Sequence, residues 1–136
     1  LDEMNGGIRA ILYNQPFDQP KKSLALELLD VYSEKGVAVG TDTYKKLKKD
    51  PTFGIKENEI NGVGYQLLQN RKKKEAIEVF KINVENFPKS GNVYDSLGEA
   101  YLADGDKNLA IANYRKSVEL DPKNEAGKKV LAEISK

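Results

Sequence analysis

The chain has 136 residues, of which 32% are charged and 39% hydrophobic, and 22 basic and 21 acidic side chains leave a formal net charge of +1. A chain of this composition is not expected to be disordered. Because its charges balance, it has no long-range electrostatic field that would attract nucleic acid or an anionic membrane. The chain has neither cysteine nor histidine, so disulfides, thiolate nucleophiles and the commonest general base are excluded as well.

Residues 1–20 are predicted to be a linker or remnant that contains at most a short helix. Apolar residues around Ile11 favour that helix, and Pro16 and Pro20 bound an extended stretch after it. No run of about 18 apolar residues occurs that could cross a bilayer, so we expect no membrane insertion.

Residues 21–50 are predicted to form a degenerate helix pair at the start of a helical domain that spans 21–136. Leucines at helical spacing indicate a first helix over about 21–35, and Gly36 is expected to end it. A second helix should then run to Asp50, before Pro51. Such a pair would provide the third unit that stacked helical repeats need for stability.

The central feature of the sequence is self-similarity at a spacing of 34 residues, the distance from Gly64 to Gly98. It divides residues 57–124 into two equivalent units, 57–90 and 91–124. The matched pairs are Val63 and Leu97, Gly64 and Gly98, Leu67 and Tyr101, Ala76 and Ala110, Ile77 and Ile111, Phe80 and Tyr114, and Pro88 and Pro122. Each unit therefore predicts two helices joined by a short turn and ended by a proline.

The matched glycines and aromatic residues predict how the helices of each unit meet. Glycine within a helix costs about 1 kcal/mol relative to alanine, so Gly64 and Gly98 indicate close approach of a second helix. Phe80 and Tyr114 are expected to fill the core of their units. Asp106 is placed to cap the second helix of the second unit.

The second unit resembles the tetratricopeptide repeat. The residues that carry this resemblance are Tyr94, Leu97, Gly98, Tyr101, Ala110, Tyr114 and Pro122. The first unit departs from the pattern at Ile60 and at Arg71, where the family usually has glycine in the turn. The resemblance implies an all-α, right-handed superhelical stack of antiparallel helix pairs, with residues 125–136 as a capping helix. It also implies binding of a protein or peptide on the concave face, which the first helix of each pair lines.

Helical geometry then selects candidate partner-binding residues on the side of these first helices that faces away from the core. They are Asn58, Asn61, Tyr65, Leu68, Gln69, Asn92, Asp95, Glu99 and Leu102. Amide side chains there can bond to a peptide backbone, and the apolar ones can hold an apolar side chain without contributing much to stability. Asp95 and Glu99 make the face neutral to acidic. The alternatives are a solvated helix face and, for Tyr65, packing against an adjacent helix.

Several other functions are disfavoured by the same residues. The basic clamp with which some members of the family grip acidic chaperone tails is absent, because the corresponding positions hold Asn61, Tyr65, Ser96, Ala126 and Val130. The basic run 71–74 is interpreted as a solvated turn and helix start, so no nucleic-acid partner is expected. We expect no catalytic residues, metal ligands or cofactors.

A second, short resemblance concerns residues 11–24, which look like the junction that follows a beta-lactamase-like serine hydrolase domain. It implies an alternative role as a structural appendage that packs on such a domain, or makes it dimerise, and self-association is a related possibility. In that case the compartment would be periplasmic or extracellular, and otherwise cytoplasmic. The Ser-x-x-Lys, Tyr-x-Asn and Lys-Thr-Gly motifs of such hydrolases do not occur in this chain.

Overall fold

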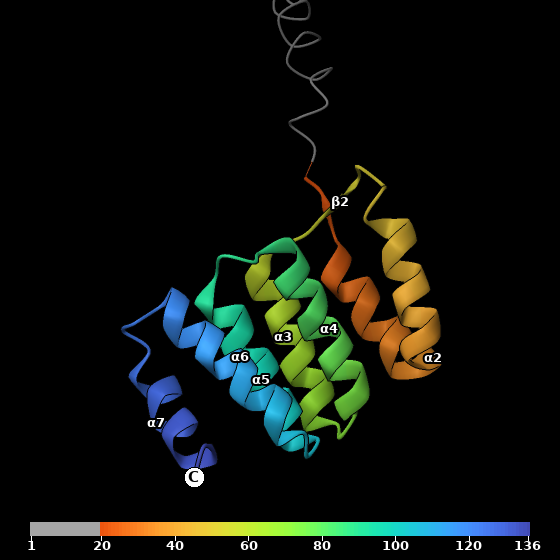
Figure 1. Ribbon diagram of the computed structural model, residues 1–136. Helices are drawn as coiled ribbons and strands as arrows, with labels where there is room; N and C mark the ends of the chain where they lie inside the picture. Colours follow the sequence, from red (N-terminus) through yellow and green to blue (C-terminus); the bar gives the residue numbers. More distant parts are fainter. Residues whose placement is uncertain (1–19) are drawn as a thin grey trace, which may run out of the picture.

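The computed structural model describes residues 20–136, and most of that part is helical (Figure 1). The elements in chain order are β1 (Lys22–Ser23), α2 (Leu24–Leu47), β2 (Phe53–Gly54), α3 (Glu57–Gln69), α4 (Lys73–Asn86), α5 (Gly91–Ala103), α6 (Lys107–Leu120) and α7 (Glu125–Ile134). The predicted all-α class is confirmed, and the interval 58–120 contains no strand. The predictions for residues 1–19 lie outside the described residues.

The 34-residue recurrence is visible as two helix pairs that lie side by side. Helix α3 packs against α4, and α5 packs against α6, while α4 and α5 join the two pairs. Helix α2 packs on α3 and α4 at one end, and α7 packs on α6 at the other, as the colour sequence in Figure 1 shows. The chain therefore builds its core between successive neighbours, as repeat proteins do.

An aromatic ring lies against the glycine of each repeat. Phe80 is fully buried and Tyr114 is 3% exposed, which confirms their core role. A β-carbon built on Gly64 would lie 2.6 Å from Cζ of Phe80, and one on Gly98 would lie 2.9 Å from Cδ2 of Tyr114. Both distances are shorter than carbon atoms tolerate, so only glycine lets the ring pack directly on the backbone of the first helix.

The turns inside the two repeats have the same backbone shape but different residues. Arg71 has a φ of 64°, and Gly105, its equivalent 34 positions later, has a φ of 86°. The Asp106 side chain accepts a hydrogen bond from the Leu109 amide at 3.1 Å, which confirms the predicted cap of α6. Lys72, at the same place before α4, makes no such bond.

Helix α2 contains a break in its backbone at Gly36, where φ is 83° and ψ is −172°. The break falls at the residue where the sequence predicts a first helix to end. The helical stretch begins at Leu24 and ends at Leu47, so it is shorter at both ends than expected. Ser23 explains the start, because its hydroxyl caps the Leu26 amide at 3.4 Å.

Strands β1 and β2 form a two-residue parallel bridge that pairs Lys22 with Phe53 and Ser23 with Gly54. This bridge was not predicted, since two residues give no periodic signal. It fastens the chain before α2 to the chain before α3 and so fixes where both helices begin. Tyr44 of α2 is also buried and receives a hydrogen bond from Asn86 of α4 at 2.9 Å. The N-terminal helices are thereby held against the first repeat from two directions.

Candidate functional site

The candidate residues lie on α3 and α5, the first helices of the two repeats, and we call the surface that they form the α3–α5 face. The opposite side of α3 carries Ile60, Val63 and Leu67, all of which are buried. A helix that buries one stripe exposes the other, but the candidates divide into two groups. The exposed ones are Asn58, Gln69, Asn92, Glu99 and Leu102, and the partly buried ones are Asn61, Tyr65, Leu68 and Asp95.

Hydrogen bonds between side chains join the middle of α3 to the middle of α5. Ser96 of α5 donates to Oδ1 of Asn61 at 2.7 Å, and the Tyr65 hydroxyl lies 3.3 Å from both Ser96 Oγ and Glu99 Oε1. The Ser96 proton is used on Asn61, so Tyr65 can donate its single proton to Ser96 or to the Glu99 carboxylate. Asn61, Tyr65 and Glu99, which the sequence placed on one face, are thus brought together by a buried serine.

Tyr65 and Leu68 are partly buried, because both pack against the hydrophobic core. The Tyr65 ring meets Phe80 edge-on, with ring centroids 5.1 Å apart and an interplanar angle of 72°. The expectation that these two side chains contribute little to stability is therefore wrong. Helical periodicity placed Tyr65 opposite the core of α3, but it could not show that α4 and α5 approach from the side.

Asp95 joins α5 to the start of α7. Its Oδ2 accepts a hydrogen bond from Nδ2 of Asn124 at 2.7 Å, and the same amide group reaches Ser117 Oγ at 3.1 Å. The other end of Asn124 caps α7, since its Oδ1 accepts from the Gly127 amide at 2.9 Å. Asp95 therefore also helps to hold the C-terminal helix in place.

The remaining candidates lie nearer the ends of the two helices. Asn58, Gln69 and Asn92 are exposed and make no side-chain hydrogen bond with any residue of the described part of the chain. Leu102 is 36% exposed, which is high for a large apolar side chain. These residues are free to contact a partner without giving up bonds that hold the fold.

Three residues of this surface were missing from the sequence-based set, namely Ser96, Asn124 and Tyr114. Ser96 could have been found because it follows Asp95 and replaces an apolar residue in a buried stripe. Asn124 precedes an acidic first turn, which is typical of a helix cap. Tyr114 was predicted as a core residue, and helical spacing does not indicate where the hydroxyl at the tip of its ring lies.

The electrostatic field of the face is negative. Neither Asp95 nor Glu99 forms an ion pair with any Lys or Arg among residues 20–136. Burial raises the pKa of Tyr65, and the charges of Glu99 and Asp95 raise it further, against a lowering by the bond to Ser96. Burial also raises the pKa of Tyr114, with Asp95 and Glu99 adding to the rise. Both phenols are therefore neutral donors at physiological pH.

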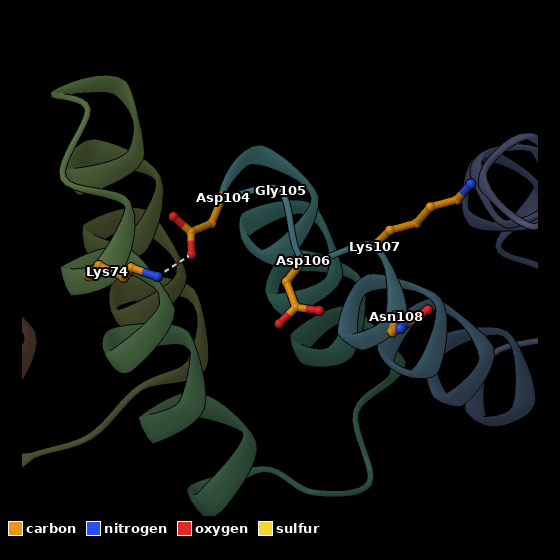
Figure 2. Close-up of a pocket in the computed structure, with 6 residues that line it drawn as sticks. All are labelled: Lys74, Asp104, Gly105, Asp106, Lys107 and Asn108. Carbon is orange, nitrogen blue, oxygen red and sulfur yellow. Dashed lines mark hydrogen bonds and ion pairs between the residues drawn. The ribbon is translucent and has the colours of Figure 1, made fainter.

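Several surface hollows lie outside this face. One is an open polar hollow at the turn between α5 and α6, lined by residues 104–108, where Lys74 of α4 reaches the Asp104 carboxylate at 2.6 Å and Lys107 points away (Figure 2). This ion pair raises the pKa of Lys74 and links the turns of the two repeats. The second hollow, of about 290 Å³, lies between α2 and α3 and is mainly apolar, with Leu26 64% exposed at its edge.

The described residues give no sign of a metal centre or a membrane-spanning helix. No group of three or more acidic side chains within residues 20–136 converges as metal ligands would. No helix in the same range combines the length and the apolar character needed to cross a bilayer.

The architecture, with successive helix pairs that each pack on the next, is that of an all-α helical repeat protein. A comparison with protein families supports this directly, because residues 91–124 match the model described as a tetratricopeptide repeat. The match coincides with α5, α6 and the following turn, so the second of the two units is a tetratricopeptide repeat. No curated protein matches the chain.

Proposed function

We propose that this chain is a non-catalytic protein-interaction module that binds a peptide, or a segment of a neighbouring domain, along the α3–α5 face. Tetratricopeptide repeats typically mediate contacts between proteins, and stacked helix pairs present an extended surface for such contacts. The finer assignment to this face depends on its own geometry.

The observation that carries the proposal is the row of side-chain bonds from Asn61 and Tyr65 of α3 to Ser96 and Glu99 of α5. These bonds fix the relative position of the two first helices before any partner arrives. A surface that is already ordered loses less conformational freedom on binding, and this preserves affinity. The exposed side chains around this bonded centre can make both polar and apolar contacts with a partner. They are Asn58, Gln69, Asn92 and Leu102.

The proposal is tested by selecting binders from a random peptide library displayed on phage, with the full chain as bait. The selected peptides are then measured against two matched double variants by isothermal titration calorimetry. Asn92→Ala with Leu102→Ala truncates an amide near the start of α5 and an exposed leucine on the proposed face. Asn108→Ala with Leu109→Ala truncates the same residue types on α6, where Leu109 is 43% exposed.

We expect the α5 variant to weaken binding about tenfold, since two contacts worth roughly 0.5–1.5 kcal/mol each are lost, while the α6 variant binds like the wild type. Equal binding by both variants, or weakening by the α6 variant alone, would contradict the proposed face. Light scattering over a range of concentrations provides a second test. A dimer that the α5 variant dissociates would show that the face serves self-association and not peptide capture.

A further inference from the structure

Gly62 lies in the middle of α3, yet the packing of the fold does not require a glycine there. Alanine in the same place would stabilise the helix, because glycine has more conformational freedom to lose on folding. Gly62 is exposed and its φ is not positive. A β-carbon built on it would meet nothing within 4 Å among residues 20–136 beyond its own stretch of helix. The surface above Gly62 can therefore be approached closely by a group from outside the fold.

Other helical glycines of this chain show what kind of group packs on such a backbone. Three of them lie directly under an aromatic ring of a neighbouring helical segment. These pairs are Gly40 with Tyr32, Gly64 with Phe80, and Gly98 with Tyr114. Without a β-carbon to hold it off, the flat ring contacts the helix backbone over a wide area. Gly62 presents the same kind of surface on the outside of the molecule.

The surface above Gly62 is part of the apolar hollow of about 290 Å³ between α2 and α3. Leu26 and Leu29 of α2 line this hollow on one side, and Val63 of α3 lines it on the other. Leu26 is 64% exposed, more than any other large hydrophobic residue among residues 20–136. Covering this leucine with an apolar group would remove its surface from water, which favours association.

The second repeat closes the position that is open at Gly62. Ser96 lies 34 positions after Gly62, and it is buried and donates a hydrogen bond to Asn61 of the preceding first helix. No such contact covers Gly62 from α2. The open position also continues the α3–α5 face, since Asn58 precedes Gly62 by about one helical turn and Gln69 follows it by about two. A peptide on that face can therefore extend into the hollow.

A second hollow, of about 430 Å³, adjoins the first and is basic. The two hollows share Ser23 and Glu59 as lining residues. Lys21, Lys22 and Lys56 also line the second hollow, and none of them forms an ion pair with an acidic residue among residues 20–136. Glu59 is the one carboxylate of the lining, and it accepts a hydrogen bond from Ser23 at 3.0 Å. The excess of positive charge complements an acidic group.

We propose that the apolar hollow receives one aromatic side chain of the bound peptide, which packs on the backbone of α3 at Gly62, and that an acidic residue next to it in the peptide reaches the adjoining lysines. The inference rests on the proposed function, which supplies the peptide. It adds the chemical class of the residues that anchor the peptide at the α2 end. An aromatic ring fits better than an aliphatic chain, because a flat ring matches an exposed glycine backbone.

The test uses the full chain and three short probe peptides. The first is N-acetyl-Gly-Phe-Asp-Gly-amide, the second has alanine in place of phenylalanine, and the third has asparagine in place of aspartate. Each is titrated into isotopically labelled protein and followed by NMR at low salt. We expect the first peptide to shift the amide signal of Gly62 and the methyl signals of Leu26, the second to leave them unchanged, and the third to bind more weakly. Added salt should weaken binding of the first peptide more than binding of the third, since it screens exposed charges.

Variants then separate a role in binding from a role in the fold. Gly62→Ala should raise the melting temperature by about 3 °C, because alanine favours the helix and meets no clash. The same methyl group would hold the ring off the backbone, so we expect binding of the first peptide to weaken about tenfold. Leu26→Ala should weaken binding to a similar extent, whereas Leu109→Ala on α6, where the leucine is 43% exposed, should leave it intact.

Several outcomes would overturn the inference. Equal responses to the phenylalanine and alanine peptides would exclude an aromatic anchor, and unchanged binding by Gly62→Ala would exclude packing on this backbone. A Gly62 signal that moves in Phe17→Ala without any peptide would show that the chain's own N-terminal segment covers the hollow. A Gly62 signal that moves with protein concentration would show that a second copy covers it. If phage-selected peptides bind in an Asn92- and Leu102-dependent way but contain no aromatic residue, the proposed function stands and only this inference fails.

Discussion

The two repeats of this chain have the same architecture but not the same local chemistry, and the comparison shows which features the fold requires. Helices α3 and α4 and helices α5 and α6 each place a glycine under an aromatic ring and turn through a residue with positive φ. The second repeat has glycine in that turn and an aspartate cap after it, and it is the unit that matches the family model. The first repeat has Arg71 in the turn and no side-chain cap at Lys72.

This difference shows that tertiary packing, not the turn, specifies the helix pair. The contacts of the buried ring and glycine are present in both repeats, whereas the favourable turn and cap are present in one. A left-handed arginine and a missing cap each cost on the order of 1 kcal/mol, which the burial of a large aromatic side chain can offset. We therefore expect the change in the free energy of unfolding to be largest for substitutions that remove a packed ring. It should be smaller for those that alter the contact between ring and helix backbone, and smallest for those in the turns.

The largest effect should come from removing the rings. Phe80→Ala should lower the free energy of unfolding by about 4 kcal/mol, because it empties a fully buried site that also supports Tyr65. Tyr114→Ala should cost about 3 kcal/mol, since the tip of its ring reaches the surface and it lacks a hydrogen bond to lose. Urea unfolding followed by circular dichroism measures both. Losses below about 1 kcal/mol at both positions would contradict the core role of these residues.

The next effect should come from adding a methyl group under each ring. At Gly64 the new β-carbon would overlap several atoms of Phe80, whereas at Gly98 the overlap with Tyr114 is milder, at 2.9–3.3 Å. Overpacking lowers the free energy of unfolding by about 1–3 kcal/mol, and the higher helix propensity of alanine raises it by about 1 kcal/mol. Gly64→Ala should therefore destabilise by about 2 kcal/mol and Gly98→Ala by less than about 1 kcal/mol. Thermal melts of the two variants side by side would show the order, and the reverse order would indicate that the second repeat is the more tightly packed.

The features that the sequence could predict are those with a period. The spacing of 34 residues gave the helix pairs, the buried Phe80 and the close approach at Gly64, because repeated burial leaves a repeated pattern. The bridge between β1 and β2 leaves no such pattern, since it involves two residues on each side.

The candidate site was predictable only as a side of two helices. Periodicity indicates which side chains face away from the core, but not which residues of a neighbouring element reach them. The sequence therefore left two roles for Tyr65, contact with a partner and packing on an adjacent helix. Its packing on Phe80 and its hydrogen bond to α5 depend on the distance between helices, which periodicity does not give. The bond from Asn124 to Asp95 likewise depends on where α7 begins, which a single helix pattern does not contain. Partner binding by this face stays a prediction.

The smallest effect should come from exchanging the turn residues of the two repeats. Arg71→Gly should stabilise the chain by roughly 0.5–1 kcal/mol, because glycine tolerates a φ of 64° that arginine adopts only under strain. Gly105→Arg places the same strain in the second repeat and should destabilise by a similar amount, and a β-carbon at this position meets no atom within 4 Å, so no clash confuses the measurement. The double exchange should come close to the sum of the two single changes, and a departure from that sum measures the coupling through the Lys74–Asp104 ion pair, which links the two turns. A clear loss of stability on Arg71→Gly would mean that the arginine side chain itself stabilises the first turn. Stabilisation by Gly105→Arg would likewise mean that contacts of an arginine side chain outweigh the backbone strain, so that the repeats differ by more than the chemistry of one residue.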